Sequence, residues 1–226
     1  MSTPSWPPER ADHPLAVLVS GGLDSAVLVG EAVRHYAAVH PIYVRADLAW
    51  EDVELVYLRR FLAAVAGPTL KPLVVLSTPV SDLYGTHWSL TGRDVPDDRT
   101  ADEAVFLPGR NVILFAKPLI WCHLNGVPEL ATAPLAANPF PDATPEFYAA
   151  LAGAVNMGMA GRVAVVRPYQ HLHKADVVRR GRGLPLEHTF SCLRPVGGLH
   201  CGRCNKCAER RAGFAAAGVP DPTRYT

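Results

Sequence analysis

The stretch Leu15-Ala-Val-Leu-Val-Ser-Gly-Gly-Leu-Asp-Ser-Ala-Val-Leu-Val29 decides the fold of this chain. An apolar run of strand length ends in Ser-Gly-Gly, and an apolar, periodic stretch then resumes as a helix. Two adjacent glycines let the backbone turn sharply and approach a ligand without a Cβ in the way. Unpaired amides at the helix start, with the positive end of the helix dipole, favour an anion. The stretch therefore predicts a strand, a tight loop and a helix whose first turn binds phosphate.

The loop at the centre of this stretch, residues 20–25, reads Ser-Gly-Gly-Leu-Asp-Ser. Ser20 and Ser25 add hydroxyl groups, and Asp24 is placed either to cap the helix or to bind a cation. The loop is not a Walker A loop, because no Gly-Lys-Ser/Thr follows, and it is not the dinucleotide fingerprint Gly-x-Gly-x-x-Gly. The non-functional alternative is an ordinary glycine-rich turn at a strand–helix junction.

The pattern Ser-Gly-Gly-x-Asp-Ser resembles the pyrophosphate loop of the ATP pyrophosphatase superfamily. Enzymes of that superfamily activate a substrate as its adenylate and release pyrophosphate. The resemblance implies ATP binding by the residues of the loop, Ser20, Gly21, Gly22, Leu23, Asp24 and Ser25. Magnesium is expected with the nucleotide, held largely by phosphates and water, with Asp24 as a candidate ligand.

Strands and helices alternate along the chain. Strands are predicted from Leu15 and at residues 38–44, 70–76, 129–134 and 163–167; helices are predicted at 25–36, 51–66, 108–125 and 174–180 and from residue 145. We expect Pro118 to kink or divide its helix. The alternation predicts an α/β fold, a doubly wound parallel sheet with helices on both faces, and the resemblance makes it adenine nucleotide alpha hydrolase-like. Ligands of such sheets lie beyond the carboxyl ends of the strands, where the loop at 20–25 lies.

Three segments are expected along the chain. Residues 1–14 are polar and proline-rich and predict a disordered leader, residues 15–190 the ATP-binding domain, and residues 191–226 a zinc-binding helical appendage. Within the domain, the pattern dissolves into Asp, Thr, Gly and Pro at residues 79–107. A loop of this length is usually functional or mobile, so we interpret it as a lid, with a plain surface excursion as the alternative.

Composition narrows the class of protein. The chain has 226 residues, a net charge of +1 and 49% hydrophobic residues, which is typical of a globular protein with a full core. The small net charge gives no indication of a nucleic-acid partner. The longest apolar stretch is interrupted too soon to span a membrane. The N-terminal residues do not show the pattern of a signal peptide, which is a basic region followed by an apolar one. A cytoplasmic enzyme fits these observations.

Four of the five cysteines are clustered near the C-terminus. They follow the spacing Cys-x8-Cys-x2-Cys-x2-Cys and are Cys192, Cys201, Cys204 and Cys207. Four thiolates at such spacings converge tetrahedrally in structural zinc sites, and a helix that zinc would fix in place follows the last one. An iron–sulfur cluster is the alternative, whereas disulfides do not fit a chain without an export signal. Cys122 stands apart and is expected to be a buried apolar residue.

The loop and the cysteine box together resemble the 7-cyano-7-deazaguanine synthase family over most of the chain. The matching segments are 20–25, 107–111 (Leu-Pro-Gly-Arg-Asn), 140–147 (Phe-Pro-Asp-Ala-Thr-Pro-Glu-Phe), 173–176 (His-Lys-Ala-Asp), 190–192 and 201–207. The resemblance implies an enzyme that adenylates a purine-like carboxylate, adds ammonia to form an amide, and then activates and dehydrates the amide to a nitrile. It implies that the zinc is structural.

The chain departs from the family pattern in two loops. The family carries Asp-Tyr-Gly-Gln-x-His after its second strand, where this chain has Arg45-Ala-Asp-Leu-Ala-Trp-Glu51. The family's Asp-Tyr-Ser-Gly ahead of Tyr-Pro-Asp-Cys is shortened to Ala137-Asn-Pro ahead of Phe140-Pro-Asp-Ala143. We therefore expect intact ATP chemistry with altered discrimination of the acid, 7-carboxy-7-deazaguanine or a close heteroaromatic carboxylate.

Candidate roles follow for residues outside the loop. Lys174 begins a helix after the fifth strand and is expected to reach the phosphates, unless it is a solvated first-turn lysine. Arg110 is a candidate clamp for phosphate or carboxylate, or an ion pair holding the lid. Asp142 is a candidate to hydrogen-bond the heterocycle's N–H groups, with a turn-forming role as the alternative, and Phe140 a candidate apolar wall, as are Trp50 and Trp88. Asn111 completes the candidate substrate set.

The expected function is an ATP-dependent carbon–nitrogen ligase. Its expected partners are a small carboxylate and ammonia, with no nucleic acid and no membrane, and a homodimer is left open. One alternative is another adenylating ligase that acts on a different carboxylate or on a protein partner. A second alternative is a zinc-stabilised nucleotide-binding module without catalysis, from which turnover of ATP to AMP distinguishes an enzyme.

Overall fold

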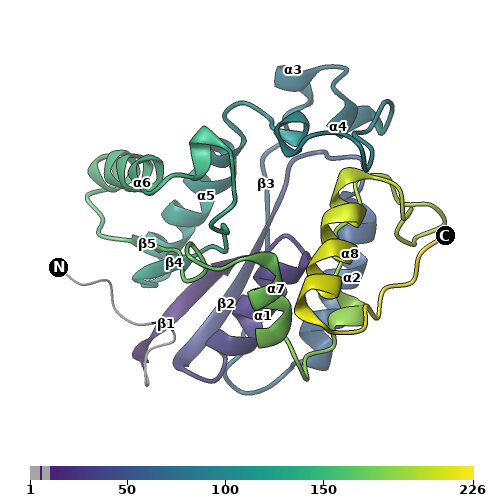
Figure 1. The fold of residues 1–226 in the computed structure, drawn as a ribbon. Helices are drawn as coiled ribbons and strands as arrows, with labels where there is room; N and C mark the ends of the chain where they lie inside the picture. Colours follow the sequence, from purple (N-terminus) through teal and green to yellow (C-terminus); the bar gives the residue numbers. More distant parts are fainter. Residues whose placement is uncertain (1–5, 7–10) are drawn as a thin grey trace.

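Five parallel strands form one sheet at the centre of the molecule (Figure 1). A computed structural model describes Trp6 and residues 11–226 of the protein. In the described residues the sheet order is β3-β2-β1-β4-β5, and every pair is parallel. The strands are β1 (Ala11–Leu18), β2 (Tyr36–Arg45), β3 (Val74–Ser77), β4 (Glu129–Ala131) and β5 (Ala164–Val166).

Helices cover both faces of this sheet (Figure 1). The α-helices are α1 (Leu23–Ala32), α2 (Glu51–Ala64), α3 (Ser81–Tyr84), α4 (Trp88–Thr91), α5 (Arg110–Leu124), α6 (Pro145–Met159), α7 (Lys174–Arg180) and α8 (Asn205–Ala217). Short 3-10 turns lie at Asp102–Val105, Pro141–Ala143 and Leu186–His188. One hydrophobic cluster joins the sheet to α1, α2, α7 and α8, and another joins it to α5 and α6. The predicted doubly wound α/β fold is confirmed.

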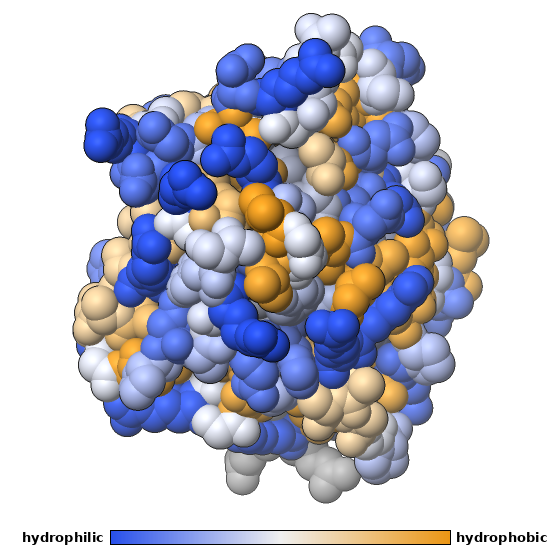
Figure 2. All heavy atoms as spheres, turned by 90° about the vertical axis from the view of Figure 1, so that its right-hand side faces the viewer, coloured by the Kyte–Doolittle hydropathy of each residue, from blue (hydrophilic) through white to orange (hydrophobic). Residues whose placement is uncertain are grey.

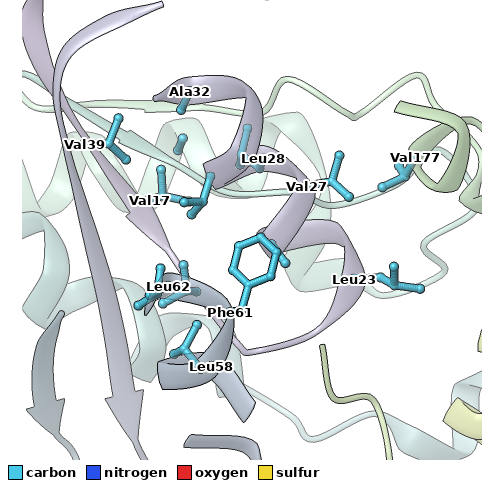
Figure 3. Close-up of a cluster of buried hydrophobic side chains, with 14 of the residues drawn as sticks. Val17, Leu23, Val27, Leu28, Ala32, Val39, Leu58, Phe61, Leu62 and Val177 are labelled. Atoms are coloured by element: carbon cyan, nitrogen blue, oxygen red, sulfur yellow. The ribbon is translucent and has the colours of Figure 1, made fainter. Parts of the chain in front are cut away.

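The central strand β1 explains why the opening stretch is apolar throughout. Leu15 and Val17 belong to the cluster on the α1 side, whereas Ala16 belongs to the cluster on the α5 side, and all three are fully buried. Figure 3 shows Val17 among side chains of α1 and α2, with Leu28 and Phe61 nearby. A strand buried on both faces reads as a continuous hydrophobic run rather than an alternating one.

The order of the strands also locates the ligand site. The chain moves outward from β1 to β3 and then returns to add β4 on the other side of β1. The loops that follow β1 and β4 therefore diverge at the carboxyl edge of the sheet. Such a topological switch point leaves a crevice, which is where open α/β sheets bind ligands.

The structure corrects several predicted boundaries. Strand β1 begins at Ala11, whose register partner is Tyr36, so residues 11–14 are strand rather than leader. Residues 1–5 and 7–10 of the expected leader lie outside the described residues, while Trp6 donates a hydrogen bond to Glu31. The third, fourth and fifth strands are shorter than predicted, and α5 continues through Pro118 as one helix.

The segment at residues 79–107, which we call the cap, is more ordered than predicted. It contains α3, α4 and a 3-10 turn, and it lies above the carboxyl edge of the sheet (Figure 1). The Tyr84 hydroxyl donates to the Pro108 carbonyl at 2.7 Å, which fastens the cap to the start of α5. The backbone N–H of Asn205 donates to the Pro96 carbonyl at 3.0 Å, which fastens the cap to the cysteine box. Closure of the cap over a substrate stays a prediction.

No helix in the described part of the chain combines the length and hydropathy needed to cross a bilayer. Figure 2 shows the face on the side of α2 and α8, where hydrophilic and hydrophobic side chains are intermixed.

Candidate active site

The phosphate loop at residues 20–25 leaves the carboxyl end of β1 and enters α1. Gly21 has a φ of +74°, and a Cβ there would lie 2.9 Å from Glu54 Cγ. Glycine is therefore required both by the left-handed backbone and by the close approach of α2. The amides of Leu23, Asp24 and Ser25 open α1 and have no intrahelical acceptor, as expected of an anion site at a helix N-terminus.

The two serine hydroxyls of the loop also shape it. Ser25 Oγ accepts a hydrogen bond from the Ser20 amide at 3.2 Å and donates to the Gly22 carbonyl at 3.3 Å. Ser20 Oγ accepts from the Gly22 amide at 3.4 Å. These internal bonds stabilise the backbone of the loop, so the serines have a structural role in addition to the predicted role as donors.

Two adjoining cavities flank the loop. The inner cavity, of about 210 Å³, lies among the ends of β1 and β2 and the starts of α2 and α5. The outer cavity, of about 310 Å³, lies among the loop after β4, α7 and α8. Asp24, Ala133, Pro134 and Asn138 line both. A ligand bound to the phosphate loop can therefore extend into either cavity, and Asp24 stands at the boundary.

Lys174 lies at the outer cavity in an alternating row of charges. The amide of His173 donates to Asp176 Oδ2 at 3.0 Å, which starts α7 at Lys174. Lys174 Nζ lies 2.6 Å from Asp24 Oδ2 and 2.8 Å from Glu209 Oε1. Lys206 Nζ lies 2.6 Å from Glu209 Oε2. Ion pairs thus link Asp24, Lys174, Glu209 and Lys206 one after another, and the structure places Lys174 beside the phosphate loop.

The ionisation of the two central members of this row follows from its geometry. Burial alone would raise the pKa of Glu209, but the ammonium groups of Lys174 and Lys206 lower it to about 2. Burial opposes the charge of Lys174, yet Asp24 and Glu209 together raise its pKa above its ordinary value. Lys174 and Glu209 are therefore both held in their charged forms at neutral pH.

Arg110 lies across the inner cavity from this row, at the start of α5. Its Nε is buried and has no hydrogen-bond partner among the described residues, and the same holds for Asp24 Oδ1. Both residues line the inner cavity. Because buried polar groups are normally paired, these two atoms are suited to a polar ligand. The geometry favours the predicted clamp over an ion pair that holds the cap.

Two glutamates of α2 that the sequence analysis did not single out also line the inner cavity. Glu54 Oε2 accepts a hydrogen bond of 2.6 Å from the Tyr43 hydroxyl, and burial raises the pKa of Glu54 to about 8. Glu51 is 2% exposed and accepts from the Ala46 amide, which closes the loop after β2. Their position just after a strand, at the carboxyl edge, was the available signal. The altered segment 45–51 thus forms part of this cavity.

The predicted substrate residues separate in the structure. Asn111 lines the inner cavity and Phe140 the outer one, where Phe140 stacks on Phe106 at 5.3 Å between ring centroids. Asp142 lines neither cavity; its Oδ2 accepts from the Asn111 amide at 3.2 Å, and its carbonyl accepts from Asn111 Nδ2 at 2.8 Å. Asp142 therefore fixes the first turn of α5. The geometry favours this structural role over the predicted contact with a heterocycle.

Trp88 of the cap stacks on Trp50 at 5.9 Å between ring centroids, and both side chains belong to the hydrophobic cluster that packs the cap against the chain. Neither lines the inner or the outer cavity, so the structure does not bring these two candidate wall residues to the ligand site.

The four-cysteine box converges into one buried cluster. The sulfur atoms of Cys192, Cys201, Cys204 and Cys207 all lie within 4.8 Å of one another. Backbone amides donate to these sulfurs, among them Cys201 N to Cys192 Sγ at 3.2 Å and Leu193 N to Cys204 Sγ at 3.4 Å. Four convergent sulfurs with amide donors fit a metal centre of the tetrathiolate type. Cys122 lies apart in α5, where burial raises its pKa to about 12, so it is an inert thiol.

Comparison with known families agrees with this geometry. The profile of a family described as "Queuosine biosynthesis protein QueC" matches residues 15–218. The chain belongs to the QueC family. This QueC-family chain is thus an enzyme of queuosine biosynthesis, and the match includes both the phosphate loop and the cysteine box.

Individual relatives support the same assignment. The chain is 34% identical to the 7-cyano-7-deazaguanine synthase of Solidesulfovibrio magneticus, over 95% of this chain and 97% of the relative. It is 36% identical to the 7-cyano-7-deazaguanine synthase of Xanthomonas campestris pv. campestris, over 92% and 96%. Among solved structures, a 4-thiouridine synthetase–RNA complex with bound ATP superposes with a TM-score of 0.52 and 16% identity, over 94% of this chain and 47% of that one. That similarity concerns the fold.

Proposed function

We propose that this QueC-family enzyme is an ATP-dependent 7-cyano-7-deazaguanine synthase acting on 7-carboxy-7-deazaguanine. The observation that carries the proposal is the phosphate loop, with free helix-start amides and Lys174 2.6 Å from Asp24, between two cavities of a chain matched to the family. An adenylating enzyme needs a triphosphate site and an adjoining acceptor site that meet at one point. The loop supplies the first and Asp24 marks the meeting point.

The chemistry proceeds in two activation steps. A carboxylate oxygen attacks the α-phosphorus of ATP and pyrophosphate leaves; ammonia then attacks the acyl carbon, and AMP leaves with that oxygen and one proton is lost. The amide oxygen attacks the α-phosphorus of a second ATP, pyrophosphate leaves again, and loss of both N–H protons expels AMP to give the nitrile. Each step leaves negative charge on departing phosphate, which positioned cations and amide donors stabilise.

The residues divide these tasks. The amides of the phosphate loop and the ammonium of Lys174 bind the phosphates, and Arg110 binds the charge that develops on the inner side. Asp24 is the candidate ligand for magnesium, because its Oδ1 is buried without a partner. The acid occupies the outer cavity, where Phe140 supplies an apolar wall and the two lysines supply positive charge. The nucleoside of ATP then extends into the inner cavity.

The cysteine box holds zinc in this proposal. Four buried sulfurs fit tetrahedral zinc, which contributes folding free energy and keeps no open position for catalysis. Elemental analysis should give one zinc per chain and no visible absorbance. Iron in the analysis, together with visible absorbance, would show that the cysteine box holds an iron–sulfur cluster and not zinc.

Three further parts of the proposal concern the surroundings of the enzyme. Free ammonia is the nitrogen donor, the protein works in the cytoplasm, and two copies associate as a homodimer. Ammonium dependence of turnover, cell fractionation and sedimentation velocity test these parts one by one.

The test of the function is product analysis. Purified enzyme is incubated with ATP, magnesium, ammonium and 7-carboxy-7-deazaguanine, and the products are identified by mass spectrometry. The proposal expects AMP, pyrophosphate, the amide and the nitrile. The amide without the nitrile would keep a ligase and discard the synthase. If 7-carboxy-7-deazaguanine is not consumed but AMP forms with another carboxylate, the enzyme has a different substrate, in line with the altered segment 45–51.

A further inference from the structure

Two residues of helix α8, Glu209 and Gly213, contact Lys174 beside the phosphate loop and have no role in the proposed function. Glu209 lies between Lys174 and Lys206, at 2.8 Å and 2.6 Å. One turn further along α8, Gly213 faces the stem of Lys174, and a Cβ there would lie 2.4 Å from Lys174 Cγ. The Lys174 side chain therefore packs directly against the backbone of Gly213, and any residue with a Cβ at this position would clash with it.

Lys174 has two carboxylate partners, Asp24 and Glu209, and Asp24 also lies at the phosphate loop. Asp24 Oδ2 is 2.6 Å from Lys174 Nζ, while Asp24 is also the candidate magnesium ligand. A divalent cation with a triphosphate competes for this carboxylate far more strongly than one ammonium group. If Asp24 binds the metal, Lys174 would have no carboxylate partner left without Glu209. Its four-carbon side chain would then be mobile, and ordering it against the phosphates would cost conformational entropy.

We propose that Glu209 is a positioning residue that holds Lys174 at the phosphate loop after magnesium nucleotide takes Asp24, and that Gly213 provides the passage for the lysine stem. The inference rests on the proposed function only in requiring magnesium nucleotide at this loop. Because α8 begins at the cysteine box, with Cys204 as its N-cap residue, the box fixes where Glu209 stands. The appendage thereby contributes to the ATP site through a helix, without touching the ligand.

The test compares the dissociation constant of magnesium α,β-methylene-ATP, measured by calorimetry, across full-length variants. Glu209→Gln keeps the size and a hydrogen-bond acceptor but removes the charge, and we expect the constant to rise about tenfold. Gly213→Ala introduces a better helix former but displaces Lys174, so we expect the dissociation constant to rise in this variant too. The KM for ATP should rise in both variants by more than kcat falls, with unchanged metal content.

The matched control is Arg179→Ala. Arg179 Nη2 donates to the Ala216 carbonyl at 2.9 Å, so this variant removes a different polar link between α7 and α8, together with the ion pair of 2.9 Å between Arg179 and Asp176 within α7. We expect it to lower the melting temperature and to leave the dissociation constant within about twofold of wild type.

Each outcome decides between distinct claims. Wild-type affinity in Glu209→Gln, with weakened binding in Lys174→Met, would overturn the positioning role and keep the ATP site. Equal weakening in Arg179→Ala would also overturn it, because general loosening of α8 would then explain the effect. If wild type itself binds no magnesium nucleotide, the proposed function and this inference both fail. Nucleotide binding without nitrile formation would remove only the proposed substrate.

Discussion

Glu209 and Glu54 lie at the two ends of the site in opposite electrostatic environments. Glu209, between two ammonium groups, has a pKa lowered to about 2 despite its burial, whereas burial raises the pKa of Glu54 beside Tyr43 to about 8. At neutral pH the charges around the outer cavity therefore compensate one another, whereas Glu54, one of two glutamates that line the inner cavity, favours its protonated form. Residues of one type in one site are therefore charged or neutral according to their partners.

The largest expected effect comes from removing the origin of α8. Cys204→Ser should abolish the metal centre and unfold the C-terminal part, because structural metal supplies folding free energy directly. Hydrogen exchange should then rise across α8 and at residues 96–100, which pair with the box, while α2 around Glu54 keeps its protection. Uniform loss of protection over the whole chain would contradict this division between the two ends.

Lys174→Met should have the next largest effect. It removes the ammonium between Asp24 and Glu209 and leaves two carboxylates facing the phosphates, so we expect kcat/KM for ATP to fall by about 10³-fold. The melting temperature should also fall, since the two carboxylates lose their shared partner. Steady-state kinetics and calorimetric melting measure the two effects. A variant with near-normal kinetics would contradict a role for Lys174 in binding the phosphates.

Arg110→Met makes the same kind of change at the inner cavity. Unlike Lys174→Met, it should lower activity without lowering stability. We expect kcat/KM to fall by about 10²-fold because a cation that stabilises developing charge is lost. The free energy of unfolding should stay within about 0.5 kcal/mol of wild type, because Arg110 Nε has no partner to lose in the described structure. Marked destabilisation would instead indicate an ion pair that holds the cap.

Glu54→Gln should show the most pH-specific effect. The unfolded carboxyl ionises near its ordinary pKa, but the folded one stays protonated up to about pH 8, so ionisation favours the unfolded state. The free energy of unfolding of wild type should therefore decline relative to Glu54→Gln as pH rises from about 4.5 to 8, and the difference should level off above that. Denaturant titrations at several pH values measure it. Parallel profiles would contradict the raised pKa.

Local signals account for what could be predicted from the sequence. The phosphate loop, the start of α7 at Lys174 and the cysteine spacing depend on neighbouring residues, so pattern alone placed them correctly. The position of Glu54 at the carboxyl edge of the sheet could be read from the sequence, but its raised pKa could not, because that environment arises when α2 packs against Gly21 and Tyr43. The sequence leaves Asp142 either as a contact for the heterocycle or as a turn-forming residue, and in the structure its carboxylate accepts from a backbone amide 31 positions earlier in the chain. Long-range contacts of this kind leave no local pattern.

The central claim is that the acid is activated at its own oxygen by adenylation. The direct measurement uses 7-carboxy-7-deazaguanine labelled with ¹⁸O in both carboxylate oxygens, with ATP, magnesium and ammonium, and analyses AMP and pyrophosphate by mass spectrometry. The account predicts that the nitrile forms with two AMP molecules, each carrying one ¹⁸O, and that pyrophosphate is unlabelled. Label in inorganic phosphate with ADP as the nucleotide product, or AMP without label, would contradict it.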